Sequence, residues 1–293
     1  MSFLGIDIGG TKVAFRVEDD TPEPYEATAT WTASGDVRQD LALLRTGVAA
    51  VRQAAGPPKG VGIALPATVD GEGRITSWPN RPHWIGLDWD GVVAALFPGT
   101  RVRTADDGDL AALAEADRAG SADVVYFGVG TGVGGGVVLG GRPVPGPRRG
   151  SCEIGHVIAD PAGPRCDCGR RGCLQAVASG PALLRTAGAS RGRSTGFAEL
   201  RRGWLAGRDW AVAAVRRGGA AVASVAVGVA ELLHPELVLV GGGVAAGLPG
   251  FAEVVADRVA GLARPGHAVP RVAPAELGGL SSLHGAVLLA RQG

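Results

Sequence analysis

Hydrophobic residues near the N-terminus form short strand-like runs separated by one helical stretch. Phe3 to Ile8 is rich in β-forming residues, stops at a Gly-Gly pair and resumes at Val13 to Phe15, which is typical of a hairpin with a glycine turn. The spacing of apolar residues predicts a helix at about Val37 to Gln53. Gly60 to Leu65 then predicts a buried strand that ends at Pro66. The first 65 residues therefore predict a hairpin, a helix and a further strand.

The same pattern returns in the middle of the chain. Val124 to Val138 again predicts a strand, a glycine turn with a threonine, and a second strand. Three of its glycines fit the spacing G-x-G-x-x-G, but a dinucleotide-binding site needs a helix after them and here a strand follows. The turns Gly9 to Thr11 and Gly130 to Gly132 instead predict a duplicated half-fold in which each turn offers backbone N–H groups to a phosphate. A plain hairpin is the alternative for either turn alone.

The last third of the chain is dominated by one long apolar helix, predicted at Trp210 to Leu233. Its longest uninterrupted apolar run, Gly218 to Ala230, is too short to cross a bilayer, so we interpret it as a buried helix. A buried strand follows at Leu237 to Val240 and leads into three glycines, Gly241 to Gly243. Such a strand and glycine triplet before a helix lets a nucleotide approach the backbone. A final helix is predicted at Leu283 to Arg291.

Composition narrows the possible partners. The chain has 293 residues, enough for two domains of ordinary size, and a net charge of +1, which gives no field to hold nucleic acid or an anionic membrane. The start, MSFLGIDIGG, lacks the basic and apolar regions of a signal peptide, so we expect a cytoplasmic protein.

Three acidic residues, Asp106, Asp107 and Asp109, stand where a predicted strand, Val102 to Ala105, gives way to a predicted helix, Leu110 to Ala119. One of them is expected to do no more than cap the helix. Three acidic residues in four positions exceed that need. Because neighbouring carboxylates raise one another's pKa, this group is a candidate for a catalytic base.

The segment Ser77 to Asp90 is predicted to be a loop and carries three tryptophans, together with Asn80 and His83. Its tryptophans fit either a cap on the core or a wall for an amphipathic ligand. The sequence alone leaves both interpretations open.

The segment His156 to Gln175 contains three of the four cysteines and one of the five histidines. Three thiolates and one imidazole complete a tetrahedral shell for zinc and leave no position for water or substrate, so the metal would be structural. The spacing Cys166-x-Cys168-x4-Cys173 includes two glycines that are free to adopt a positive φ. A disulfide is the alternative, which the lack of a secretory signature disfavours. We assign no role to Cys152.

Four segments in this order resemble the ROK family of bacterial sugar kinases, sometimes called glucokinase-like: Asp7 to Lys12, Gly128 to Gly136, Glu153 to His156, and Cys166 to Cys173. The resemblance covers nearly the whole chain. The glycine turns are weak signals by themselves, whereas the cysteine knuckle directly after Glu-Ile-Gly-His is highly specific.

The resemblance implies an α/β, ribonuclease-H-like (actin-like ATPase) fold with two α/β domains and an active-site cleft between them. The small domain would be residues 1–105, closed by a C-terminal helix at 281–293, and the large domain would be residues 106–280 with the zinc knuckle. The implied activity is that of an ATP:hexose 6-phosphotransferase that uses ATP, catalytic Mg²⁺ and structural Zn²⁺. We expect a homodimer or homotetramer.

The resemblance also implies a role for individual residues. Asp107 would be the catalytic base. The sugar contacts would be Asn80, Asp106, Asp107, Glu153, His156 and Gln175. The nucleotide and its metal would be bound by Asp7, Gly9, Gly10, Thr11, Lys12, Gly130, Thr131, Gly132, Gly241, Gly242 and Gly243. The zinc ligands would be His156, Cys166, Cys168 and Cys173.

Two positions depart from the family pattern and bear on the substrate. The usual Asn-Asp pair is Asp106-Asp107, and the usual glutamate after the third cysteine is Gln175. The family asparagine contacts the sugar near its 3-hydroxyl, where an aspartate would favour an ammonium group. We therefore hypothesise a 3-amino-hexose such as kanosamine (3-amino-3-deoxyglucose) as the substrate, with glucose poorer. An ordinary glucokinase is the alternative.

Other functional classes also occur in the family. The ROK repressors carry a DNA-binding helix-turn-helix ahead of the first phosphate motif. Only six residues precede Asp7 here, so we do not expect the DNA-binding part of a repressor. A sugar sensor without catalysis remains a further alternative, although a sensor has little reason to keep an aspartate at position 107.

Overall fold

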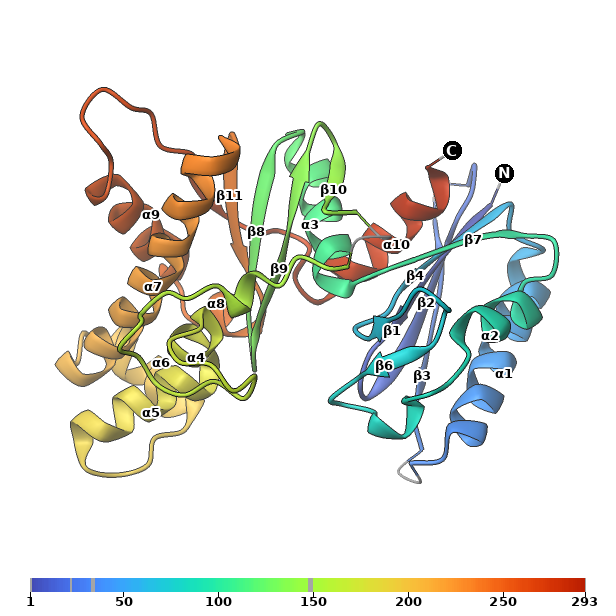
Figure 1. The fold of residues 1–293 in the computed structure, drawn as a ribbon, viewed down its shortest axis with the longest axis horizontal. Helices are drawn as coiled ribbons and strands as arrows, with labels where there is room; N and C mark the ends of the chain where they lie inside the picture. Colours follow the sequence, from blue (N-terminus) through green and yellow to red (C-terminus); the bar gives the residue numbers. More distant parts are fainter. Residues whose placement is uncertain (1, 22, 33–34, 147–149, 293) are drawn as a thin grey trace. The chain divides into compact units, whose positions relative to one another are not determined.

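The computed structural model describes residues 2–21, 23–32, 35–146 and 150–292, and the chain forms two compact units (Figure 1). Unit 1 comprises Met1–Ala114, Pro145–Ser151 and Leu280–Gly293, and unit 2 comprises Glu115–Val144 and Cys152–Gly279. The division along the chain falls inside helix α3 (Asp107–Ala119). The domain boundary predicted between residues 105 and 106 lies just before that helix.

The sheets of the two units have the same plan, which confirms the predicted duplication. In unit 1 the strand order is β3-β2-β1-β4-β7, and in unit 2 it is β10-β9-β8-β11-β12. In each sheet three strands pair antiparallel and two more continue in parallel. The strands of unit 1 are β1 (Phe3–Ile8), β2 (Lys12–Glu18), β3 (Tyr25–Thr30), β4 (Gly60–Ala64) and β7 (Arg101–Ala105). Those of unit 2 are β8 (Val124–Val129), β9 (Val133–Leu139), β10 (Arg142–Val144), β11 (Leu237–Gly241) and β12 (Arg271–Pro274).

The helices of unit 1 include α1 (Val37–Ala55), α2 (Trp89–Leu96) and the C-terminal α10 (Ser281–Arg291), and a small hairpin of β5 (Thr68–Val69) and β6 (Ile75–Ser77) accompanies them. Helix α10 lies directly on the sheet because two strand residues have no side chain. A Cβ on Gly62 would come within 1.9 Å of the Ala286 carbonyl oxygen, and one on Gly5 within 2.7 Å of the Val287 side chain. This close approach ties the end of the chain to the strands that begin it.

The tryptophans of the segment Ser77 to Asp90 belong to the core of unit 1. Trp78, Trp84 and Trp89 are each at most 1 % exposed, and the rings of Trp78 and Trp84 meet edge to face with centroids 4.9 Å apart. They cap the core, so the alternative of a ligand-binding wall is wrong. The segment is also more ordered than the predicted loop, because a 3-10 helix forms at Pro82–Trp84 and α2 begins at Trp89.

Unit 2 is built around α7 (Asp209–Leu233), as Figure 1 shows. By length and composition alone this helix is long enough to cross a membrane, but half of its most apolar window is buried inside the protein. Gly218 and Gly219 allow close packing against the side chains of Leu183 and Val254, so core packing accounts for the buried face of α7. The helices around it are α4 (Leu174–Ala178), α5 (Gly180–Arg191), α6 (Phe197–Leu205), α8 (Gly243–Gly247) and α9 (Phe251–Gly261), with 3-10 turns at Ile154–His156 and Gly278–Leu280.

Candidate functional site

Unit 1 gathers acidic side chains at the carboxyl ends of its parallel strands. Asp7 lies near the end of β1, and Asp106 and Asp107 directly follow β7. Burial, together with the negative charges of Asp106 and Asp7, raises the pKa of Asp107 to about 7. Burial also raises the pKa of Asp7, opposed by a hydrogen bond from the Ser282 hydroxyl (2.7 Å) and by the charge of Lys12. These three carboxyl groups therefore form one electrostatic cluster, as the predicted catalytic base requires.

Asp106 caps helix α3. Its Oδ1 accepts a hydrogen bond from the Gly108 backbone N–H at 2.9 Å, and its carbonyl oxygen accepts one from Leu110 at 3.0 Å. The expectation that one of the three acidic residues serves as a cap is confirmed. The cap also holds Asp107 at the first helical position, where the peptide dipoles favour a negative charge.

The first glycine turn and Asn80 lie together in unit 1. The Gly9 N–H donates to the Lys12 carbonyl oxygen at 2.9 Å and closes the turn between β1 and β2. A Cβ on Gly10 would lie 3.0 Å from Cβ of Asn80. The structure thus places the predicted sugar contact Asn80 directly against the predicted phosphate turn.

The two predicted nucleotide segments of unit 2 are also neighbours. Gly130 N–H donates to the Gly132 carbonyl oxygen at 2.9 Å and closes the turn between β8 and β9. Gly242 has a φ of 87°, and a Cβ there would lie 2.5 Å from the Val129 carbonyl oxygen, so no side chain fits. The Gly130 carbonyl oxygen in turn accepts from the Gly180 N–H at the start of α5 (2.8 Å). The glycine triplet therefore lies against the end of β8 where the turn begins.

The four residues predicted to bind zinc converge in unit 2. The ligand atoms of His156, Cys166, Cys168 and Cys173 all lie within 4.8 Å of one another. Cys168 Sγ is 3.6 Å from Cys173 Sγ, and Cys166 Sγ is 3.7 Å from His156 Nδ1. Tetrahedral zinc, with bonds of about 2.3 Å to sulfur and about 2.0 Å to nitrogen, requires separations of roughly 3.5–3.8 Å. The residues present fit a closed structural zinc site, and the four cysteines are free thiols rather than disulfides.

The thiols of this cluster differ in their acidity. A hydrogen bond from the Arg170 backbone lowers the pKa of Cys168 to about 6, whereas burial raises the pKa of Cys173 to about 11. Zinc binds thiolates, so bound metal would hold both groups deprotonated. The buried Cys173 thus depends on the metal to carry a charge.

Residues next to the zinc ligands connect the knuckle to the other predicted contacts. Nδ1 of His156 faces Cys166, and its Nε2 lies 4.0 Å from Glu153 Oε2. Gln175 donates from Nε2 to Cys166 Sγ at 3.5 Å, and its Oε1 is 3.3 Å from the place that a Cβ on Gly132 would take. The contact between Gln175 and a zinc ligand was not predicted from the sequence, although Gln175 stands only two positions after Cys173.

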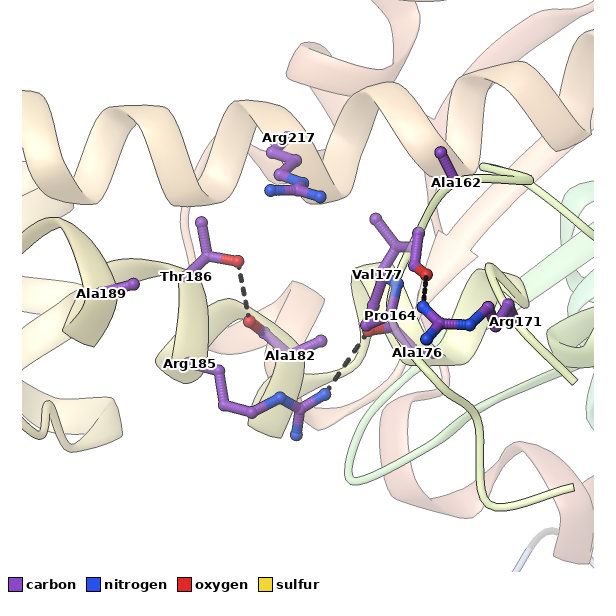
Figure 2. Close-up of a pocket in the computed structure, with 11 residues that line it drawn as sticks. Ala162, Pro164, Arg171, Ala176, Val177, Ala182, Arg185, Thr186, Ala189 and Arg217 are labelled. Atoms are coloured by element: carbon purple, nitrogen blue, oxygen red, sulfur yellow. Dashed lines mark hydrogen bonds between the residues drawn. The ribbon is translucent and has the colours of Figure 1, made fainter. Parts of the chain in front are cut away.

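A cavity of about 400 Å³ opens beside the knuckle in unit 2 (Figure 2). Figure 2 shows Arg217 and Arg185, from α7 and α5, at its rim. Arg185 donates to the Ala176 carbonyl oxygen and Arg171 to that of Gly163, each at 3.4 Å. The lining residues are Ala162, Gly163, Pro164, Arg171, Ala176, Val177, Ala182, Arg185, Thr186, Ala189 and Arg217. None of the predicted sugar, nucleotide or zinc residues is among them, so this cavity is separate from the predicted active site.

The fold and the order of these sites define an α/β protein of the actin-like ATPase class. The sequence profile described as the ROK family matches residues 3–293, and the chain belongs to this family. It is 51 % identical over 288 residues to a kanosamine kinase from Amycolatopsis mediterranei (strain S699), a match that covers 98 % of this chain and 95 % of the relative.

Solved structures show the same likeness. A ROK hexokinase from Thermus thermophilus has a TM-score of 0.87 at 33 % identity, with 99 % of this chain and 98 % of that chain covered. A ROK family glucokinase from Streptomyces griseus, solved in complex with glucose and AMPPNP, has a TM-score of 0.76 at 26 % identity, with both chains covered completely. The predicted family and fold class are confirmed.

Proposed function

We propose that this chain is an ATP-dependent sugar kinase that phosphorylates the 6-hydroxyl of kanosamine in preference to glucose. The observation that carries the kinase activity is the buried Asp107, whose pKa is raised to about 7 beside two other carboxyl groups. Two findings support the amino-sugar: the 51 % identity to a kanosamine kinase and the carboxylate of Asp106 at the position of the family asparagine.

The proposed reaction is a direct phosphoryl transfer. The sugar O6 attacks the γ-phosphorus of ATP, the bond between that phosphorus and the β–γ bridging oxygen breaks, and ADP leaves with the electron pair. Asp107 accepts the hydroxyl proton and fixes the direction of attack. Asp7 would help to hold Mg²⁺, which would supply positive charge to the phosphates, and the backbone N–H groups of the glycine turns would offset the remaining charge.

The proposed contacts are those expected from the family pattern. The sugar is bound by Asn80, Asp106, Asp107, Glu153, His156 and Gln175. The nucleotide is bound by Gly9 to Lys12, Gly130 to Gly132 and Gly241 to Gly243. Zinc bound by His156, Cys166, Cys168 and Cys173 has no open position for a phosphate, so it would hold the knuckle in shape and leave the chemistry to Asp107. The homodimer or homotetramer and the cytoplasmic location remain predictions.

Asp106→Asn tests the choice of sugar. The aspartate can form a charge-assisted hydrogen bond to the 3-ammonium group, and the asparagine can form only a weaker one. We expect the ratio of kcat/KM for kanosamine to kcat/KM for glucose to fall about tenfold or more. An ADP-release assay with both sugars measures it. The loss of the Asp106 charge also lowers the pKa of Asp107, and it does so for both substrates. The ratio of the two kcat/KM values therefore isolates the contact between residue 106 and the amine.

The fold should survive that substitution, because asparagine is as good an N-cap as aspartate. An unchanged ratio would exclude the charge argument and leave an ordinary glucokinase. If the protein released no ADP with either sugar, that result would contradict the proposed kinase activity.

Gln175→Leu tests the contact between Gln175 and the zinc knuckle. Leucine cannot donate a hydrogen bond to the Cys166 thiolate, so we expect zinc affinity to fall by roughly 10-fold or more. Competition with a colorimetric chelator measures the affinity. Gln53→Leu, on the exposed face of α1 in unit 1, is the matched control and should bind zinc as the wild type does. Equal zinc affinity in the two variants would show that Gln175 does not act on the metal.

A further inference from the structure

Unit 1 contains a buried carboxylate with several donors, Asp40 in helix α1. Asp40 is 1 % exposed. Its oxygens accept hydrogen bonds from Arg81 Nε (3.2 Å), Arg81 Nη2 (2.8 Å) and Trp84 Nε1 (2.8 Å), and His83 Nε2 lies 2.7 Å away. Burial raises the pKa of Asp40, but the hydrogen bonds from His83, Trp84 and Arg81 outweigh that and bring the pKa below its ordinary value. Asp40 is therefore ionised and fixes the segment 81–84.

Arg81 connects this carboxylate to the first glycine turn. Its Nη1 donates to the Gly10 carbonyl oxygen at 2.9 Å, and its guanidinium lies over the Trp31 ring, 4.7 Å from the centroid. Trp31 Nε1 donates to the Gly9 carbonyl oxygen at 2.7 Å. Two successive carbonyl groups of the turn are thus held by two side chains that are stacked on each other.

Fixing these carbonyl groups also fixes the N–H groups that follow them. In a planar trans peptide the N–H points opposite to the C=O. With its carbonyls directed at Trp31 and Arg81, the turn directs the N–H groups of Gly10 and Thr11 the other way. Those are donors that the proposed function assigns to a phosphate.

Arg81 also follows Asn80, the proposed sugar contact that lies against Gly10. We propose that Asp40 and Arg81 form a positioning pair that holds the phosphate turn and Asn80 in one arrangement, so that ATP and sugar meet a preorganised surface. The identity of the ligands, ATP and sugar, rests on the proposed function. The pairing of Asp40 with Arg81 rests on the contacts described above. Neither residue touches substrate in this proposal, because each acts through the turn or through Asn80.

The guanidinium is the group that this position requires. It contacts Asp40 through Nε and Nη2 and Gly10 through Nη1, and a lysine ammonium cannot reproduce this planar fork. Arg81→Lys keeps the charge that Asp40 needs and loses the hold on Gly10. We expect KM to rise about tenfold for both ATP and sugar, with a smaller change in kcat.

Two aromatic substitutions separate positioning from stability. Trp31→Phe removes the hydrogen bond to the Gly9 carbonyl oxygen and is expected to raise KM for ATP. Trp84→Phe removes a hydrogen bond to Asp40 of similar length but leaves Arg81 on Gly10, so it is expected to lower Tm with both KM values unchanged. Trp84→Phe is thus the matched control for a loss of stability in the same network.

The experiment measures kcat, both KM values, Tm, and amide hydrogen exchange of peptides that cover residues 9–12 in the full-length, zinc-loaded protein. Faster exchange in the turn and raised KM in Arg81→Lys and Trp31→Phe, but not in Trp84→Phe, support the inference. If all three variants had the exchange rates and KM values of the wild type and only a lower Tm, the inference would be overturned. Asp40 and Arg81 would then have a purely structural role. Hydrogen exchange measures the order of the turn without requiring catalysis. A protein that is inactive on every hexose would therefore contradict the proposed function, while the exchange data would still test the role of Asp40 and Arg81.

Discussion

Asp107→Asn is expected to lower kcat by roughly two to four orders of magnitude, because the variant loses the group that accepts the sugar's proton. Initial rates of ADP release at saturating ATP and sugar measure the loss. The matched control is Asp117→Asn, an exposed position on the same helix, which should turn over at the wild-type rate. Near-normal turnover in Asp107→Asn would contradict the assignment of the base.

The pH dependence of the wild type follows from the same group. Asp107 acts as a base only when ionised, and its pKa of about 7 means that activity falls as the pH drops below that value. Glucose is the better substrate for this profile, since it has no ammonium group of its own to titrate. The acid limb should be missing from the residual activity of Asp107→Asn.

Stability should change in the opposite direction to activity. The pKa of Asp107 is raised from 3.8 to about 7 on folding, so between these values the folded protein binds more protons than the unfolded chain. Its contribution to the free energy of unfolding therefore falls as the pH rises through this window. Asp107→Asn removes that cost, and at pH 7 we expect its Tm to equal or exceed that of the wild type. A variant that is both inactive and unstable would indicate a structural role instead.

The parts of the fold that the sequence predicted well are those specified by short-range patterns. Phe3 to Ile8 and Leu237 to Val240 are runs rich in β-forming residues that each end at consecutive glycines, and both form interior strands of their sheets. The long apolar helix was placed within one residue at its start, at Asp209 rather than Trp210. In these elements the spacing of apolar residues and the residues that end the element are both present in the local sequence. Their conformation therefore depends little on tertiary context.

Elements that depend on tertiary context were missed. Tyr25–Thr30 is an edge strand whose residues alternate between exposed and half-buried, which makes its hydrophobic pattern weak. The segment Ser77 to Asp90 was predicted as a loop, but packing of its tryptophans orders it. In each case neighbouring elements, rather than the local sequence, determine the conformation.

The same distinction applies to the site. The zinc ligands and the acidic cluster lie close together in the sequence, so their spacing could be interpreted directly. Asp40 resembles an ordinary acidic residue in the first turn of a helix, and its partner Arg81 is 41 positions away. The contact between Gln175 and Cys166 Sγ depends on how the knuckle folds back on itself. Supporting contacts of this kind have no local signature.

Removal of zinc is expected to cost sugar binding and stability together. Cys173 is fully buried, and a Cβ on the adjacent Gly172 would lie 1.6 Å from the Asp160 carbonyl oxygen, so the knuckle is tightly folded with little hydrophobic core of its own. Structural zinc contributes apparent binding energies of about 10–16 kcal/mol in small zinc domains. That is comparable to the whole stability of an ordinary domain, about 5–15 kcal/mol. Without the metal the loop that carries His156 and Gln175 should lose its shape.

The test compares Cys173→Ser with Cys152→Ser, the same change at the cysteine outside the cluster. Cys173→Ser should lose zinc, lower Tm and weaken sugar binding measured by calorimetry, whereas Cys152→Ser should retain zinc and sugar binding. Partial chelation of the wild type should reduce the fraction of active protein without changing kcat per zinc-loaded chain, because a metal with a filled shell takes no part in phosphoryl transfer. Zinc-free protein that binds sugar normally would show that the knuckle does not position the sugar contacts. A kcat that changes per zinc-loaded chain would place the metal in the reaction.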